Sequence, residues 1–358
     1  MPPSPAPDEL GSIVLDQADR LFAQHATRET LAGAERGAFP APLWDAIEAA
    51  GLPLALVPES KDGAGLSPRE ALGLIRRSAY HTIPVPLGET MIAAALWAEA
   101  SGSALKGAAS LAPANTSDRM TIKRIGNGYT LDGRATRVPW ADQVDHVLVF
   151  ARDATGAGFL ALVPRGAGAC EPHRNLANER RDTLVFEGAA VDAVRPAPAG
   201  LADGLLRHGA VLRAAQMAGA MERSLDHALA HANERRQFGR SIAKFQAIQH
   251  LLAEAAGHYA AASAAADLAA DAYGGPGFAL AVAIAKARTG EAAGRVAAIC
   301  HQVHAAMGFT QEHPLHFATR RLWSWRDEFG NETFWQERIG RLIAAAGGEA
   351  LWPTLVGM

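Results

Sequence analysis

The stretch from residue 201 to 347 constrains the fold most, because it consists of long runs without proline. Turn residues interrupt these runs at Gly239, at 274–277 and at 308–314. Along one run the apolar residues recur near i, i+3 and i+4 spacing, as on the buried face of a helix: Ile242, Phe245, Ile248, Leu252, Ala255 and Tyr259. Long helices joined by short breaks predict an antiparallel helical bundle.

Two segments with different patterns precede this bundle. Residues 9 to 107 indicate helices joined by proline- and glycine-marked loops, and Ser67 followed by Pro68 has the residue types of an N-cap and a first helical position. From about 108 to 196 short β-type runs alternate with turns. The predicted fold is therefore mainly α with a central β domain, with boundaries at 1–107, 108–200 and 201–358.

Two local predictions concern the middle domain. The sequence Gly126-Asn127-Gly128 lies between two β-type runs and predicts a hairpin through its Asn-Gly signal. The turn-rich stretch 164–182 predicts a surface loop.

The composition argues against several classes of protein. Hydrophobic residues make up 49% and charged residues 20% of the 358 positions, as in globular proteins. The net charge is −3 with acids and bases interspersed, so no nucleic-acid partner is expected. The alanine-rich segment 255–300 contains charged residues that are unfavourable in a bilayer, so no membrane span is expected: Asp267, Asp271, Lys286, Arg288 and Glu291.

Cysteine usage and the start of the chain favour a cytoplasmic setting. Cys170 and Cys300 are too few for a disulfide scaffold or a zinc site, and residues 1–9 lack the features of a signal peptide. His227 and His231 lie four residues apart with Glu234 following, but three ligands along one helix seldom converge on one ion. No metal site is predicted.

The segment 233–254 predicts a helix–turn–helix corner, in which Gly239 allows the chain to reverse and Ser241 caps the next helix. Arg235, Phe238 and Gln246 bring a guanidinium, a flat apolar ring and an amide close to one helix start. This set suits an anionic, aromatic cofactor, because guanidinium binds phosphate bidentately and helix N-termini favour negative charge. An ordinary exposed corner would also accommodate these residues.

A family resemblance favours the first interpretation. The pattern Arg235-x-x-Phe238-Gly239-x-x-Ile242-x-x-x-Gln246 closely resembles the acyl-CoA dehydrogenase flavoproteins. The loop 57–67 and the stretch 301–314 are similar to two further segments of that family, in the same order along the chain. The chain is therefore identified as a member of the acyl-CoA dehydrogenase family.

The resemblance implies a helical bundle, a β-barrel-like middle domain and a C-terminal four-helix bundle, with FAD between the domains and a neighbouring subunit. It implies that Arg235 reaches the flavin pyrophosphate of the partner chain and that Phe238 packs on the cofactor. Gln246 and Gln302 would bond the adenosine half. The residue types agree with these roles, because a guanidinium suits a phosphate, an aromatic ring suits stacking and side-chain amides suit polar edges.

Two more positions belong to the predicted cofactor site. Asn331 stands where the resemblance places a threonine after the catalytic glutamate. Trp140 lies in the segment 137–141, in which the family's flavin-facing tryptophan and threonine are replaced, and it either stacks near the flavin or belongs to the core.

The expected catalytic base is missing. Dehydrogenation of an acyl-CoA thioester requires a carboxylate within reach of the proton next to the carbonyl. The resemblance places this glutamate at Phe329, before Gly330, and in some members at Gly209. Glu328 and Glu332 flank the first position and are weak candidates for a replacement, so the catalytic residue stays unknown.

Two versions of an FAD-dependent acyl-CoA dehydrogenase follow from these residues. Either the chain is a self-sufficient enzyme in a homo-oligomer, or it is a subunit without a base in a hetero-oligomer, as a dimer or tetramer with a catalytic homologue. The two vacant positions favour the second version. A structural or regulatory helical subunit that has lost flavin is the alternative from another class.

Overall fold

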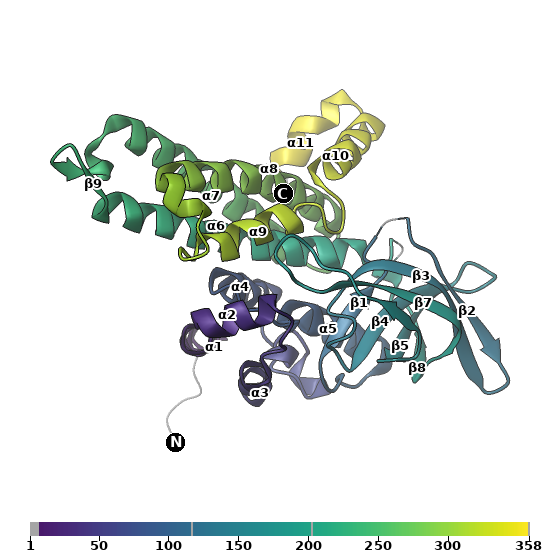
Figure 1. The fold of residues 1–358 in the computed structure, drawn as a ribbon. Helices are drawn as coiled ribbons and strands as arrows, with labels where there is room; N and C mark the ends of the chain where they lie inside the picture. Colours follow the sequence, from purple (N-terminus) through teal and green to yellow (C-terminus); the bar gives the residue numbers. More distant parts are fainter. Residues whose placement is uncertain (1–6, 116, 202, 357–358) are drawn as a thin grey trace, which may run out of the picture.

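The computed structural model describes residues 7–115, 117–201 and 203–356. Along the chain, a helical part is followed by a sheet and then by a second helical part (Figure 1). The N-terminal part contains these helices: α1 (Pro7–His25), α2 (Arg28–Glu35), α3 (Ala41–Ala49), η1 (Leu52–Leu54), η2 (Glu59–Lys61), α4 (Pro68–Tyr80) and α5 (Leu87–Ser101). Helix α4 begins as predicted, because the Ser67 hydroxyl accepts from the backbone N–H of Glu70 at 3.3 Å and the Glu70 carboxylate accepts from that of Ser67 at 2.8 Å.

Eight strands of the described chain form one sheet in the order β6-β7-β3-β2-β4-β5-β8, with β1 paired to β4. Their bounds are β1 (Ala109–Ala112), β2 (Met120–Ile125), β3 (Gly128–Pro139), β4 (His146–Arg152), β5 (Gly158–Pro164), β6 (Ala169–Glu171), β7 (Arg181–Ala190) and β8 (Ala193–Pro196). The β2–β3 hairpin is present, but its two turn residues are Gly126 and Asn127, one residue earlier than the Asn-Gly signal. Gly126 has a φ of 58°, which glycine adopts without strain.

The prediction of a surface loop over 164–182 holds for residues 164–176, which are exposed or half-buried, but it is wrong for the end of the stretch, residues 177–182. The segment contains β6, and it brings Glu179, Arg181 and Asp182 into the interior with exposed fractions of 5%, 4% and 0%. Charged and turn-forming residues predict exposure only when they lack partners, and here ion pairs compensate their burial.

The C-terminal part begins after η3 (Ala199–Leu201) and forms the predicted antiparallel bundle. Its elements are α6 (Leu206–Glu234), β9 (Arg236–Gln237), β10 (Arg240–Ser241), η4 (Ile242–Lys244), α7 (Gln246–Asp271), α8 (Phe278–His304), η5 (Ala305–Phe309) and α9 (Leu315–Trp325). Small residues let helices approach closely, since a Cβ on Gly219 of α6 would lie 2.0 Å from the carbonyl oxygen of Arg76 on α4. Among the described residues no helix is long and apolar enough to cross a membrane.

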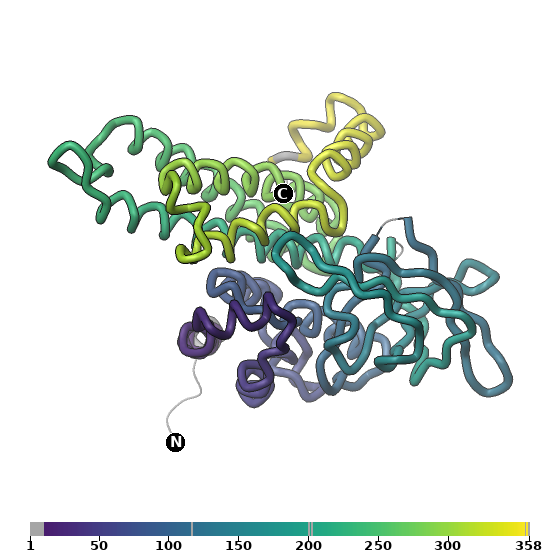
Figure 2. The backbone as a smooth tube through the Cα atoms, viewed as in Figure 1, coloured from purple at the N-terminus to yellow at the C-terminus, as the bar shows by residue number. Residues whose placement is uncertain are grey.

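The chain ends in an arm of α10 (Glu332–Ala346), η6 (Gly348–Ala350) and α11 (Leu351–Val356), and α10 packs on α8. One hydrophobic core is continuous from the N-terminal helices through the sheet to the start of α6, and a second fills the bundle. The predicted fold class, mainly α with a central β domain and a C-terminal bundle, is confirmed. Figure 2 shows that the corner 235–245 lies at the end of the bundle far from the sheet.

Candidate functional site

A cleft of about 540 Å³ lies between the sheet and the C-terminal helices. Its walls come from β3, β7 and the end of α9, and they include Thr136, Arg137, Thr183, Trp323 and Asp327. A neighbouring hollow of about 230 Å³ shares Arg137 and Asp327 with the cleft and extends to Asn331. An aromatic ring beside cationic, hydroxyl and amide groups suits a ligand with a flat apolar part and a polar part.

Glu328, one of the two weak candidates for a base, lines this cleft as an ion bound by two arginines. Its Oε1 accepts from Nε of Arg181 at 2.7 Å and its Oε2 accepts from Nε of Arg213 at 2.6 Å. Arg213 is fully buried and donates to Glu89 of α5 at 2.8 Å as well. Burial alone would raise the pKa of Glu328, but the two guanidiniums outweigh it and lower the pKa.

Glu179 continues this network on the other side of Arg181. Its carboxylate accepts from Arg181 at 2.9 Å, from Nε of Arg321 at 2.9 Å and from Nε1 of Trp325 at 3.0 Å. Burial opposes ionisation here too, yet Arg321 and Arg181 lower the pKa of Glu179 to about 2. The loop before β7 is thereby joined to α9 through charged groups inside the protein.

Positions 209 and 329, at which the family resemblance places a base, meet in space. A Cβ built on Gly209 of α6 would lie 2.2 Å from Cδ1 of Phe329, so the phenyl ring occupies the volume that a side chain at position 209 would need. Phe329 is 2% exposed and has a φ of 55°. Arg213 lies one helical turn after Gly209, with its Cζ 5.6 Å from the centre of the Phe329 ring.

Helix α8 holds the loop that carries Phe329 in place. Lys286 is fully buried, and its ammonium donates to the carbonyl oxygens of Arg326 and Gly330, each at 2.7 Å. Burial lowers the pKa of Lys286 to about 7. Nε1 of Trp335 donates to the carbonyl oxygen of Phe329 at 3.0 Å, so the backbone on both sides of the ring is held.

Glu332, the second weak candidate, is paired with Arg326. Burial would raise the pKa of Glu332, but the hydrogen bond from Arg326 lowers it. Asn331 lines the hollow, while its side-chain oxygen accepts from the backbone N–H of Phe334 and caps α10.

Four of the predicted cofactor residues lie at the opposite end of the bundle. Arg235, Phe238, Gln246 and Gln302 are all exposed, Phe238 to 90%, and they come from the ends of α6 and α8, the corner and the start of α7. The guanidinium of Arg235 makes no hydrogen bond or ion pair with the described residues. These side chains and Asn331 therefore cannot touch one molecule of flavin within a single chain.

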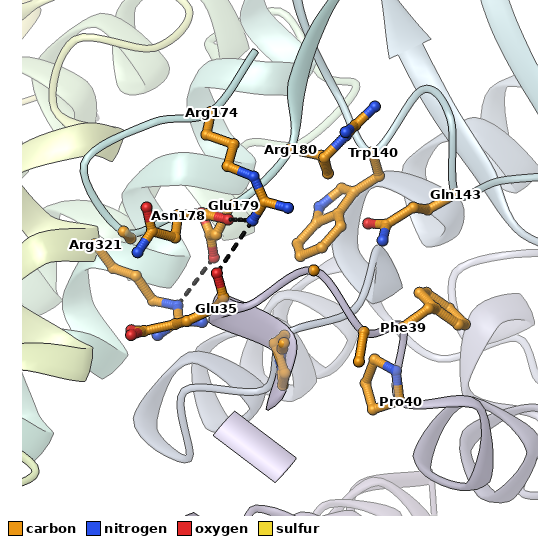
Figure 3. Close-up of a pocket in the computed structure, with 15 residues that line it drawn as sticks. Glu35, Phe39, Pro40, Trp140, Gln143, Arg174, Asn178, Glu179, Arg180 and Arg321 are labelled. Carbon is orange, nitrogen blue, oxygen red and sulfur yellow. Dashed lines mark hydrogen bonds and ion pairs between the residues drawn. The ribbon is translucent and has the colours of Figure 1, made fainter. Parts of the chain in front are cut away.

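Trp140 lies in neither region. Its side chain is 6% exposed and belongs to the hydrophobic core, which was one of its two interpretations. Figure 3 shows its ring beside Gln143, and the same pocket is lined by Phe39 and Pro40, which precede α3. The pocket in this view has a volume of about 10 Å³, enough for roughly one water molecule.

His227 and His231 are half-buried. Their rings contact His313, with centroid distances of 5.5 and 6.4 Å, and His231 stacks on His304 at 4.6 Å. Within the described residues no group of three or more histidine, cysteine or acidic side chains is arranged to hold a metal ion.

Sequence reasoning did not single out the buried ion pairs. Arg213 sits in the run Ala-Val-Leu-Arg-Ala-Ala, and Glu89 stands before an apolar helix segment. A charged residue within an apolar helical face is a signal for a buried partner, because an unpaired buried charge is costly.

Comparisons with known proteins place the chain among characterised sequences. The model of the family "Acyl-CoA dehydrogenase, C-terminal domain" matches residues 200–343. The chain is 27% identical to acyl-CoA dehydrogenase IpdE2 of Mycobacterium tuberculosis over 320 residues, covering 88% of this chain and 91% of the relative. It is 26% identical to FadE27 of the same organism, covering 95% and 97%. The solved ChsE4-ChsE5 complex from M. tuberculosis has a chain with a TM-score of 0.85 and 24% identity, covering 94% and 97%.

Proposed function

Because the chain belongs to the acyl-CoA dehydrogenase family of oxidoreductases, we propose that it works as the subunit without a base in an assembly with a catalytic homologue. The reaction would be α,β-dehydrogenation of an acyl-CoA thioester. FAD accepts the hydride in this chemistry when it is bound. The contribution of this chain would be to complete the flavin site of its neighbour.

The contact between Phe329 and Gly209 carries this proposal. A general base must come within hydrogen-bond reach of the proton that it removes, usually about 3 Å. The phenyl ring fills the place of a carboxylate at either position, since a side chain at 209 would collide with it at 2.2 Å. The carboxylate of the adjacent residue, Glu328, has both oxygens bound by guanidiniums and is a weak base at neutral pH.

The residues present fit FAD in two separate halves. At the end of the bundle, the free guanidinium of Arg235 suits a pyrophosphate and the exposed Phe238 ring offers a flat apolar surface. In the cleft, Trp323 and Thr136 suit the ring system of the cofactor, with Asn331 at the neighbouring hollow. A site composed of both halves requires two chains, which agrees with the known ChsE4-ChsE5 complex as a structural neighbour.

The test is expression of the chain alone and together with an acyl-CoA dehydrogenase homologue from the same organism that retains the glutamate. We expect a stable hetero-oligomer with bound flavin, and acyl-CoA oxidation only in the complex. Turnover by the chain alone would refute the proposal that it lacks a base. Absence of flavin from both preparations would refute the flavin role.

Arg235→Ala tests whether this chain contributes a side chain to the flavin site of its partner. Loss of one charged bidentate hydrogen bond, about 1.5–3 kcal/mol, should weaken flavin binding by the complex roughly 10- to 100-fold. Arg236→Ala is the matched control, because Arg236 is the next residue and is also exposed. Equal flavin affinity in the two variants would show that Arg235 does not contact the cofactor.

A further inference from the structure

Four histidine rings meet where the end of α6, the end of α8 and the segment 305–314 come together. His227 and His231 lie on α6, His304 is the last residue of α8, and His313 lies in the segment that links α8 to α9. The ring centroids of His304 and His313 are 4.4 Å apart, and those of His231 and His304 are 4.6 Å apart. The ring of His227 contacts that of His313 at 5.5 Å. This histidine cluster therefore holds the segment 305–314 on the C-terminal end of α6.

The hydrogen bonds of the cluster suit uncharged rings. Nδ1 of His304 donates to the carbonyl oxygen of Cys300 at 2.7 Å. Nδ1 of His313 accepts from the backbone N–H of Leu315, the first residue of α9, at 3.2 Å. A proton that adds to His313 must add at this nitrogen, where it would face the N–H of Leu315. Protonation of His313 is therefore incompatible with the hydrogen bond that joins the segment to the start of α9.

No carboxylate is paired with these rings to compensate a positive charge. In the part of the chain that the structure describes, the histidines that pair with a carboxylate all lie outside the cluster: His81, His146, His173 and His258. Since like charges at such short distances repel and the rings lack a counter-charge, protonation of the closed cluster is unfavourable.

The charged and titratable groups around the cluster do not supply the missing partner. Those that act on the rings come from the end of α6, from α8 and from α9: Arg223, Glu234, Arg235, His301 and His316. Glu234 is the one carboxylate in this set, and it is exposed. Asp226 and Glu312, the other acids next to the cluster in sequence, are exposed as well. From α2, Arg28 donates to the carbonyl oxygen of Gln311 at 3.1 Å and adds a positive charge beside the segment.

Burial lowers the pKa of all four rings. It lowers the pKa of His227 to about 3, with smaller contributions from Arg223 and the neighbouring histidines. It lowers the pKa of His313 to about 4, with smaller contributions from the other histidines around it. The pKa values of His231 and His304 are lowered too, with burial as the largest cause. At neutral pH the closed cluster is therefore uncharged.

The segment begins at a strained residue. Ala305 directly follows α8 and has a φ of 50° and a ψ of −136°, a conformation that is costly for a residue with a Cβ. Such a backbone persists only where surrounding contacts hold it. The contacts of the histidine cluster and the hydrogen bond from Arg28 hold this segment, so loss of the first would let Ala305 relax.

We propose that the histidine cluster is a pH-sensitive switch, which holds the segment 305–314 on the end of α6 at neutral pH and releases it in mildly acidic solution. The proton is the ligand of this switch, because among the described residues no three such side chains are arranged to hold a metal ion. The switch depends neither on flavin nor on a partner chain. Its consequence for Gln302, two residues before His304, rests on the proposed function.

The sign of the pH dependence follows from the lowered pKa values. A histidine with a lowered pKa in the closed state binds more protons when the segment is open, so the open state gains as pH falls through the ordinary value near 6.5. Between pH 7.5 and pH 5.5 each such histidine should favour the open state by about tenfold. His227 and His313 together predict an increase of about 100-fold in opening.

Amide hydrogen exchange of the full-length chain alone, measured by mass spectrometry at pH 7.5 and 5.5 and corrected for the intrinsic exchange rate, tests the switch. Protection of peptides that cover 305–317 should fall by about 100-fold, because the hydrogen bonds of the Thr310 and Leu315 amides open with the segment. Protection of α4 should change little. Since the chain is measured without flavin or partner, failure of the proposed function would leave this result unchanged.

His313→Asn removes one titratable group and keeps an oxygen that can accept from Leu315, so the fall in protection should shrink to about tenfold. His227→Gln, on α6, should have the same effect. His250→Asn is the matched control, because His250 is exposed on α7 and outside the cluster. No fall in protection, an equal fall in α4, or a His313→Asn variant with the pH dependence of the wild type would each overturn the proposal.

Discussion

Replacement of Glu179 by glutamine tests the charged network that joins the sheet to α9. The carboxylate is 5% exposed and receives hydrogen bonds from Arg181, Arg321 and Trp325 at 2.9–3.0 Å. Its pKa falls from an ordinary value near 4.5 to about 2 in the folded protein. Since each pKa unit corresponds to about 1.4 kcal/mol, ionised Glu179 contributes roughly 3 kcal/mol at pH 7.

The sign of the pH dependence follows from the lowered pKa. A carboxyl group with a lower pKa in the folded state stabilises the protein above its unfolded pKa, and this contribution is lost as pH falls from about 4.5 towards about 2. At pH 3 roughly 1 kcal/mol of the contribution remains. The difference in unfolding free energy between wild type and Glu179→Gln should therefore shrink by about 2 kcal/mol from pH 7 to pH 3.

Urea unfolding followed by circular dichroism at both pH values measures this difference. Glu187→Gln is the control, because Glu187 lies on the same strand, β7, but is exposed. A Glu179→Gln penalty that is the same at both pH values would refute the reasoning, since it would mean that the carboxylate is not ionised between the two arginines.

Two further changes test the packing and the helix start. Gly219→Ala should lower the free energy of unfolding by about 2 kcal/mol or more, because the new Cβ would lie 2.0 Å from the carbonyl oxygen of Arg76. Gly257→Ala on α7 is the control: a Cβ there meets no atom within 4 Å, so this change should stabilise the protein by up to about 1 kcal/mol. Thermal unfolding of the two variants measures the difference. Ser67→Ala should cost about 1 kcal/mol through loss of the α4 cap, and a much smaller urea-unfolding penalty would show that the capping hydrogen bonds contribute little.

Local patterns made much of the fold predictable. Helix α4 starts at Pro68 because a serine followed by proline satisfies the first turn, and the breaks at 239, 274–277 and 308–314 separate the bundle helices. The surface position of Arg235 and Phe238 also follows from their place in a corner. These features depend on neighbours within a few residues, which a sequence displays directly.

The charged interior could not be predicted in the same way. Glu328 is bound by Arg181 and Arg213, which lie 147 and 115 positions before it in the chain. Such pairing depends on how the sheet and helices pack, so the turn-rich segment 164–182 gave no sign that its end, residues 177–182, is buried. The sequence shows glycine at 209 and phenylalanine at 329, where the resemblance places a base, but not that these positions face each other.

The residues around positions 209 and 329 oppose a carboxylate at either position. A glutamate at position 329 would stand beside the buried Arg213, whose Cζ lies 5.6 Å from the present ring centre, and a guanidinium at such a distance would lower its pKa and weaken it as a base. A glutamate at 209 would collide with Phe329. Arg213 in turn cannot be removed alone, because Glu89 would remain as an unpaired buried carboxylate and Glu328 would keep only Arg181. Several coordinated substitutions would thus be needed to place a carboxylate at 209 or 329, which supports the proposal that the chain works as the subunit without a base.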